Sequence, residues 1–215
     1  MPKAEPKLRG IELGLSFLAG HLDATGFLIA KGFFVSFMSG NTTQLGVWSY
    51  GGFDAIFLPG SLLLSFVAGV TAGAMIAWLR TARERSTLLA LSLILLAVAA
   101  AAHTLGSTLG FLLPAAFAMG LVNNVFIRDN EEAVGVTYMT GALVRVGQNF
   151  AARLLGRKDD IRSGFGQMWL CLAAGAALGG WMHYLPYAAG PVAALVMNAA
   201  LLMVAWRVER SAGER

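Results

Sequence analysis

The feature that most limits how this chain can fold is a series of apolar runs, each about 20 residues long. A helix of that length crosses the hydrocarbon core of a bilayer. The chain is 57% hydrophobic and 13% charged, whereas a typical soluble domain has about 25% charged residues. Because no alternating pattern of barrel strands occurs, the sequence predicts an all-α polytopic membrane protein. We expect membrane-spanning helices at about 11–31, 57–79, 86–105, 108–127, 164–185 and 189–207.

Two further segments, about 33–50 and 133–155, are apolar but interrupted by polar residues, so hydropathy alone allows either six or eight crossings. Most of the 16 Lys and Arg residues lie in four clusters: before the first span, at 80–85, at 153–162 and from 207 onward. The positive-inside rule places such clusters in the cytoplasm. Only six crossings put all four on that side. We therefore expect both polar segments to be re-entrant or parts of broken helices.

The two halves of the chain resemble each other in sequence and in order. FLAGHLD at 17–23 matches FAMGLVN at 117–123, and SFMSGNTTQLG at 36–46 matches TYMTGALVRVG at 137–147. An internal repeat of this kind indicates duplicated architecture. Because each half holds three crossings, the second half starts on the opposite side of the membrane. The sequence thus predicts two inverted three-helix repeats, an arrangement found in many transporters.

These repeats form one transmembrane domain over 1–215. Repeat 1 covers about 11–105 and repeat 2 about 108–207, between short cytoplasmic tails at 1–10 and 208–215. The basic clusters place both termini in the cytoplasm.

The polar stretches of the two repeats are the predicted binding elements. Non-helical backbone at membrane depth survives only where it is buried in protein or faces water. Gly40 and Gly141 allow each chain segment to turn, and Ser39 or Thr140 can cap the helix that follows. The start of such a helix presents free N–H groups and a positive dipole end. We expect it to bind an anion or a carbonyl-like polar group.

Two ionisable residues at membrane depth each allow two interpretations. Asp23 either binds a proton or cation, with His21 nearby, or anchors the first span to the polar segment. Its repeat partner is Asn123, which cannot titrate. Arg145 either binds an anion and excludes cations, or extends to the cytoplasmic face.

Asn41 and Thr42 either line a solute pathway or satisfy the backbone of their own segment. Ala142 stands where the first repeat has Asn41, so a symmetric two-Asn filter is not predicted. The candidate pathway residues are Asp23, Ser39, Gly40, Asn41, Thr42, Asn123, Thr140, Gly141, Arg145 and Gln148.

The pattern GHLDATGFL…FVSFMSGNTTQLG, with the later TYMTGALVRVG, resembles the YoaK-like family of bacterial membrane proteins, domain of unknown function 1275. The resemblance covers about 13–207. Its most distinctive parts are Asp23 in GHLDATGF and the SGNTT turn, where Ser39 stands in place of the more usual Thr. It implies a multi-spanning inner-membrane protein without an established substrate.

Several function classes are not expected. The lone Cys171 excludes a disulfide framework. No metal or cofactor motif and no HExxH, GxSxG or midplane acidic pair occurs, so we do not expect an enzyme. The net charge of +4 follows from the loop clusters, so no nucleic-acid partner is expected. Beyond the lipid bilayer, one possible partner is a second copy through small-residue helix faces, which are Gly69 with Gly73 and Gly175 with Gly179.

The sequence leaves two functions open. The first is a transporter or channel for a small polar or anionic solute, based on the inverted repeat and the embedded polar residues. The alternative is a structural or accessory membrane subunit without transport activity.

Overall fold

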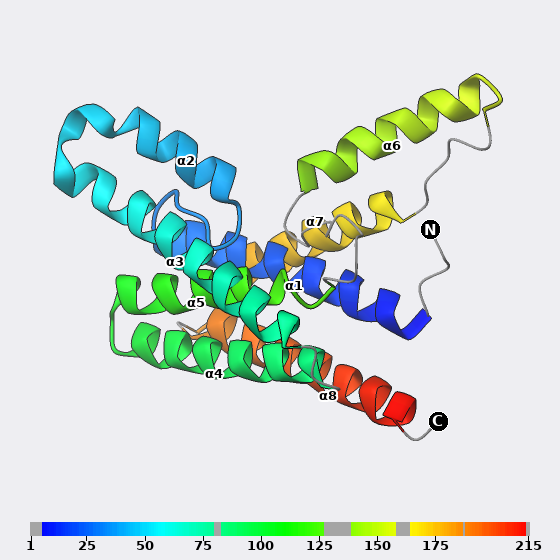
Figure 1. Cartoon of the computed structure of the whole chain (residues 1–215). Coiled ribbons are helices and arrows are strands. Elements are labelled where there is room, and N and C mark those ends of the chain that lie inside the picture. The colour runs from blue at the N-terminus through cyan, green and yellow to red at the C-terminus, as the bar shows by residue number, and fades with distance from the viewer. Residues whose placement is uncertain (1–5, 80–82, 127–138, 158–163, 187, 214–215) are drawn as a thin grey trace.

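The computed structural model describes residues 6–79, 83–126, 139–157, 164–186 and 188–213, and these residues form helices joined by short connections (Figure 1). The helices are α1 (Pro6–Ile29), α2 (Met38–Val47), the short 3-10 helix η1 (Ser49–Gly51), α3 (Phe53–Trp78), α4 (Glu84–Thr104), α5 (Thr108–Val122), α6 (Met139–Leu154), α7 (Phe165–Met182) and α8 (Ala189–Gly213).

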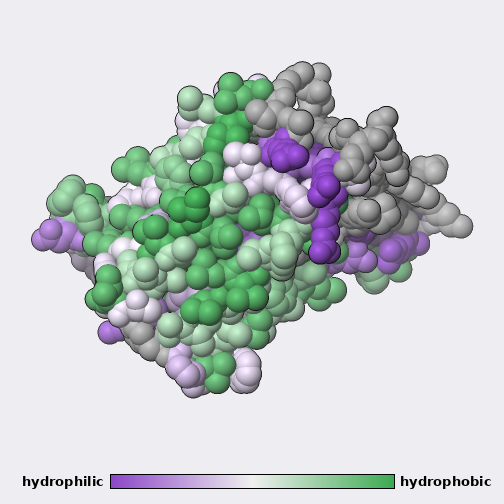
Figure 2. Space-filling model, turned by 90° about the horizontal axis from the view of Figure 1, so that it is seen from below, coloured by the Kyte–Doolittle hydropathy of each residue, from purple (hydrophilic) through white to green (hydrophobic). Residues whose placement is uncertain are grey.

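Three of these helices, α3, α4 and α8, are long and apolar enough to cross a membrane, and α5 is a shorter apolar helix. Apolar side chains cover most of the face shown in Figure 2. Leu64, Ile94 and Val196, on those three helices, are each more than half exposed. A monomeric soluble protein rarely exposes a large continuous apolar surface. The helical, apolar molecule agrees with the predicted class of polytopic membrane protein.

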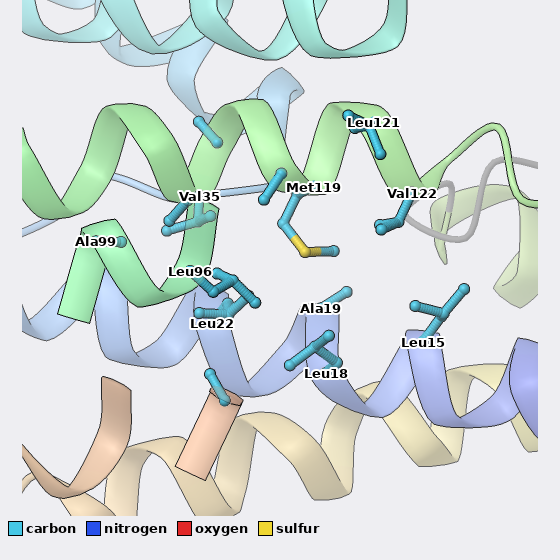
Figure 3. Packing of buried hydrophobic residues seen from close by; sticks show 14 of the residues in the cluster. Leu15, Leu18, Ala19, Leu22, Val35, Leu96, Ala99, Met119, Leu121 and Val122 are labelled. Atoms are coloured by element: carbon cyan, nitrogen blue, oxygen red, sulfur yellow. The ribbon is translucent and has the colours of Figure 1, made fainter. Parts of the chain in front are cut away.

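The core lies inside the bundle and is built largely from the facing sides of α1 and α5, with residues of α3, α4 and α8. Leu18 and Leu22 of α1 lie between that helix and Met119 of α5, and Leu96 of α4 closes the same cluster (Figure 3). All four side chains are almost fully buried. Because α1 and α5 supply the most buried faces, they hold the other helices in place.

Close backbone contacts show that α1 and α7 run in the same direction. A Cβ atom at Gly175 would lie 1.9 Å from the carbonyl oxygen of Phe17, and one at Gly179, four residues later, would lie 2.5 Å from that of His21, also four residues later. Both helices therefore approach each other at glycine, as small residues permit. The residue numbers of the contacts rise together, so the pair is parallel.

The same type of contact joins α3 and α5. A Cβ atom at Gly120 would lie 2.2 Å from the carbonyl oxygen of Phe66, and one at Gly73 would lie 2.7 Å from that of Leu121. This pair is also parallel. The small-residue pairs of the sequence thus serve contacts within one chain. The structure holds one copy, and homodimer formation stays a prediction.

The remaining contacts set the other directions. Ser92 of α4 accepts a hydrogen bond from Asn198 of α8, and the start of α4 meets Glu209 near the end of α8, so α4 and α8 are antiparallel. Gly14 of α1 packs on Leu201 of α8, and α4 and α5 form an antiparallel hairpin. Consequently α1, α4 and α7 run one way, and α3, α5 and α8 run the other way.

The predicted turns at Gly40 and Gly141 are wrong. Gly40 lies inside α2 and Gly141 inside α6. Helix α2 begins at Met38 after Phe37, without a side-chain cap, so Ser39 is not its N-cap. Gly40 is needed for space, because a Cβ atom there would lie 2.5 Å from the ring of Phe37.

The irregular backbone of the first polar segment lies before the polar stretch, at 30–37. In the second segment, 133–138 lies outside the described residues, and Thr140 is the second residue of α6.

Candidate functional site

Asp23 binds the loop that connects α1 to α2. Its Oδ1 accepts hydrogen bonds from the backbone nitrogens of Ser36 at 2.6 Å and Phe37 at 3.2 Å, and its Oδ2 accepts one from Ser36 Oγ at 2.7 Å. Helix α2 starts at the next residue, Met38. The carboxylate therefore occupies the positive end of the α2 dipole, the position at which the sequence predicts a bound anion or carbonyl-like polar group.

Asn41 holds the same loop from the other side. This fully buried residue accepts a hydrogen bond from the backbone nitrogen of Phe34 at 3.0 Å and donates one to the carbonyl oxygen of Phe34 at 2.7 Å. Gln44 donates to the carbonyl oxygen of Gly32 at 3.3 Å. The loop at 30–37 thus obtains from side chains the backbone hydrogen bonds that a helix would have supplied.

Ser39 and Thr42 lie on the exposed face of α2, away from this loop. The Thr42 hydroxyl donates to the carbonyl oxygen of Met38 at 2.9 Å, and Thr43 makes the equivalent bond to Ser39 at 3.0 Å. The hydroxyl groups of Thr42 and Thr43 therefore bond within their own helix.

A cavity of about 590 Å³ lies between α1, the loop before α2, the start of α6, and α7. A volume of this size suits a small-molecule site. Asp23 lines it from α1, Thr140 from the second position of α6, and Trp169 from α7. The cavity therefore joins the starts of the two polar helices. The rest of its lining is mostly apolar.

Three phenylalanine rings form one side of this cavity. The centroids of Phe27 and Phe34 are 5.1 Å apart, and those of Phe34 and Phe37 are also 5.1 Å apart, with an interplanar angle of 86°. An edge-to-face arrangement is favourable for aromatic pairs. The three rings and Asp23 therefore line the same cavity.

Of the ten candidate residues, the structure brings Asp23 and Thr140 together at the cavity. Arg145 and Gln148 are not among its lining residues, and their side chains bond to each other on α6 at 3.4 Å. Asn123, directly after α5, donates to the carbonyl oxygen of Met119 in that helix at 2.7 Å. The remaining candidates, Ser39, Gly40, Asn41, Thr42 and Gly141, lie on α2 and α6 but do not line the cavity.

His21, the expected neighbour of Asp23, faces another part of the bundle. Its Nε2 lies 2.8 Å from the carbonyl oxygen of Gly190 on α8, so this nitrogen is the donor. The Thr25 hydroxyl in turn donates to the backbone carbonyl of His21 at 2.8 Å. His21 therefore links α1 to α8 and does not pair with Asp23.

A smaller cavity of about 260 Å³ lies at the ends of α1, α4 and α7, lined by Thr25, His103, Thr108 and His183 among others. Over the described residues, no cluster of three or more His, Cys, Asp or Glu side chains is placed to hold a metal ion.

The sequence interpretation missed three polar residues that matter in the structure. Trp169 lines the larger cavity. Asn198 is fully buried and donates to Ser92 at 2.6 Å. Glu209 accepts hydrogen bonds from the start of α4. A lone polar residue in an apolar run, as Asn198 is, was the available signal.

Comparisons with known proteins agree with the resemblance drawn from the motifs. A family model described as "Protein of unknown function (DUF1275)" matches residues 11–206. A UPF0700 transmembrane protein of Rhizobium meliloti (strain 1021) is 40% identical over 165 residues, which are 77% of this chain and 71% of that protein. No solved structure matches. The chain therefore belongs to the DUF1275 family of membrane proteins, whose function is unknown.

Proposed function

We propose that this protein is a transporter or channel for a small solute, and that the solute binds in the cavity beside Asp23. The observation that carries this proposal is the cavity itself. The starts of two short polar helices, α2 and α6, approach the same cavity, which opens to the surface of the bundle, and a carboxylate lies in its wall. Interrupted helices and an ionisable side chain at membrane depth are typical of solute sites in transporters.

The directions of the helices support six crossings. Successive crossings alternate in direction, so eight helices that each crossed once would leave α4 and α8 parallel. Their contacts at Ser92 with Asn198 make them antiparallel. By the same reasoning α2 and α6 add no net crossing. Each enters and leaves the membrane on one side, as the positive-inside rule requires.

Matched contacts support an inverted repeat. Gly20 of α1 packs on Leu172 of α7, and Gly120 of α5 packs on Phe66 of α3. These pairs occupy corresponding positions of the two repeats, and α1 and α5 run in opposite directions. Two inverted repeats related by a pseudo-twofold axis produce such an exchange of partners.

A contact between two equivalent residues gives further support for the inverted repeat, because a pseudo-twofold axis would map such a contact onto itself. Ser92 and Asn198 stand 106 residues apart, as do the corresponding glycines Gly69 and Gly175. The two side chains bond directly to each other. Equivalent residues of two repeats can meet only on or beside the axis, so the axis passes between α4 and α8.

Basic residues gather at one end of the bundle, which supports cytoplasmic termini. Arg9 at the start of α1 donates to Gln167 at the start of α7. Arg85 at the start of α4 lies beside Glu209 near the end of α8. We place this end in the cytoplasm and the protein in a bacterial inner membrane.

One observation favours the alternative, an accessory subunit without transport activity. Asp23, Asn41 and Gln44 all bind the backbone at 32–37, so their polarity has a structural use. In that case the cavity would be closed to water.

Cysteine accessibility tests the proposal. On a Cys171→Ser background, single cysteines at the exposed residues Arg83 and Arg157 should label from the cytoplasm, and those at Tyr50 and Ser107 from the outside. Within this plan, Thr140→Cys should react with a small water-soluble thiol reagent. The control is Leu64→Cys, which is exposed on the apolar surface and should not react.

Two results would contradict this function. Labelling of Arg83 from outside would remove the six-crossing plan. A cysteine at Thr140 as unreactive as one at Leu64 would make the cavity dry, and the accessory role would then be the better explanation.

A further inference from the structure

We propose that the cavity beside Asp23 binds a small organic cation, with its charged nitrogen at the carboxylate and its carbon substituents against the aromatic rings. This inference rests on the proposed function, because it names the class of solute for the same cavity.

The charge of the cavity favours a cation. Among the described residues that line it, Asp23 alone is charged. Within the part of the chain that the structure describes, the hydrogen bonds to this carboxylate come from the backbone nitrogens of Ser36 and Phe37 and from the Ser36 hydroxyl, all of them neutral groups. A carboxylate without a cationic partner is costly away from bulk water. A bound cation would supply that partner, and the attraction is stronger there than in water.

The aromatic lining selects the kind of cation. Phe27, Phe34 and Phe37 form a cluster on one side, and Trp169 lines the cavity from α7. The face of an aromatic ring attracts a cation, and tryptophan does so best. Ammonium groups that carry methyl or methylene substituents also gain from apolar contact with such rings. Binding of quaternary ammonium groups is a common use of aromatic cavities.

A metal ion does not suit this cavity. Mg²⁺ and Ca²⁺ require about six or more oxygen ligands. Of the lining side chains, Asp23 and Thr140 carry oxygen, and the others are apolar or aromatic.

An anion does not suit it either, because Asp23 would repel it and already lies at the start of α2. Arg145 is not one of the lining residues. The anionic solute that the sequence allowed is therefore the less favoured class.

The test uses choline as the probe and 3,3-dimethylbutan-1-ol as its neutral counterpart of nearly equal shape. Binding is measured by isothermal titration on the purified full chain in a maltoside detergent. We expect the wild type to bind choline at least about tenfold more tightly than the neutral alcohol. Asp23→Asn removes the charge, keeps an acceptor oxygen for the loop, and should lose at least about tenfold in choline affinity.

Two further variants complete the design. Asp54→Asn removes an exposed carboxylate in the first turn of α3, outside the cavity, and should bind choline as the wild type does. Trp169→Leu keeps an apolar side chain and should lose about three- to tenfold. If Asp23→Asn does not fold, two results still decide whether the cavity binds a cation. They are the comparison of the two probes on the wild type and the choline affinity of the Trp169→Leu variant.

The cation could come from solution or from a lipid headgroup, which share this chemistry. Titration with dihexanoyl phosphatidylcholine below its micellar concentration separates the two. Tighter binding than free choline would assign the site to a lipid headgroup, and weaker binding would assign it to a free solute. Both results support a cation site.

The proposal is overturned if the wild type does not bind choline, or binds both probes equally, or if Asp23→Asn binds choline unchanged. A failed titration together with a reactive cysteine at Thr140 would leave the transport proposal standing with another solute. Choline binding with an unreactive Thr140→Cys would instead leave a binding site without transport.

Discussion

The carboxylate of Asp23 on α1 lies 2.6 Å from the backbone nitrogen of Ser36, thirteen residues later in the chain. This contact, with the bonds to Ser36 Oγ and to the nitrogen of Phe37, joins α1 to the start of α2. The most distinctive acidic residue of the sequence thus has a definite structural role. Its charge also faces the larger cavity.

We predict that Asp23→Ala destabilises the protein by about 2–4 kcal/mol, because three donors lose their acceptor. Asp23→Asn should cost less than half as much, since one amide oxygen still accepts from both backbone nitrogens. Thermal unfolding in detergent, followed by the loss of the monodisperse peak, measures both. Asp54→Ala on α3 is the control and should cost less than about 1 kcal/mol. Equal midpoints for the wild type and Asp23→Ala would show that other contacts hold the loop.

Asn41 should be as important as Asp23 for the same loop. Asn41→Ala removes both hydrogen bonds to the backbone of Phe34 and should cost about 2–3 kcal/mol. Asn41→Asp keeps the acceptor but loses the donor, and it adds a second carboxylate to the loop that Asp23 binds. We therefore expect Asn41→Asp to be no more stable than Asn41→Ala. Thr42→Val, on the exposed face of α2, should stay within about 0.5 kcal/mol of the wild type. A variant at Asn41 that unfolds like Thr42→Val would contradict this account.

The two tight glycine contacts should respond alike to substitution. Gly20→Ala would place a Cβ atom 2.0 Å from a backbone oxygen of the neighbouring helix, and Gly120→Ala would place one 2.2 Å from such an oxygen. Because backbone cannot move aside as a side chain can, each should cost at least about 2 kcal/mol.

The matched control is Gly147→Ala in α6, where nothing lies within 4 Å of the added atom. Alanine there should be neutral or stabilising by up to about 1 kcal/mol, through its helix propensity. The measurement is the yield and unfolding midpoint of each variant. A large difference between Gly20→Ala and Gly120→Ala would argue against equivalent repeats.

Glu209 should be the main contact between the start of α4 and the end of α8. It accepts hydrogen bonds from the backbone nitrogens of Arg85 at 3.0 Å and Ser86 at 3.2 Å, and from Ser86 Oγ. A carboxylate at a helix N-terminus also interacts favourably with the helix dipole. Glu209→Ala should therefore cost about 2–3 kcal/mol, and Ser211→Ala, two residues further along α8, less than about 0.5 kcal/mol. Comparable unfolding midpoints for these two variants would refute this role.

The sequence alone predicted the positions of the long helices. The predicted run at 57–79 is α3, Phe53–Trp78, and the run at 86–105 is α4, Glu84–Thr104. This succeeded because the length and apolarity of a spanning helix are local properties of the chain. The motifs around Asp23 also indicated the family that the comparisons then showed.

The polar segments could not be predicted from local rules in the same way. Glycine at position 40 suggested a turn, and the structure places it inside α2, against Phe37. Glycine permits both a turn and a close approach, and only the neighbours decide which is used. The candidate residues on α6 likewise fall into two groups, those that line the cavity and those that do not. Which face of a helix lies toward a cavity depends on how the helix packs. Thr140 lines the cavity and Arg145 does not.

By itself, then, the sequence determined the helical class, the positions of the long apolar helices and the family, because transfer of apolar segments into lipid depends on composition along the chain. The tertiary structure decided what the polar residues do. Asp23 meets Ser36, and Asn198 meets Ser92, only because packed helices bring distant parts of the chain within hydrogen-bonding distance. Such contacts depend on the register between helices, and neither residue type nor spacing within one helix contains that information.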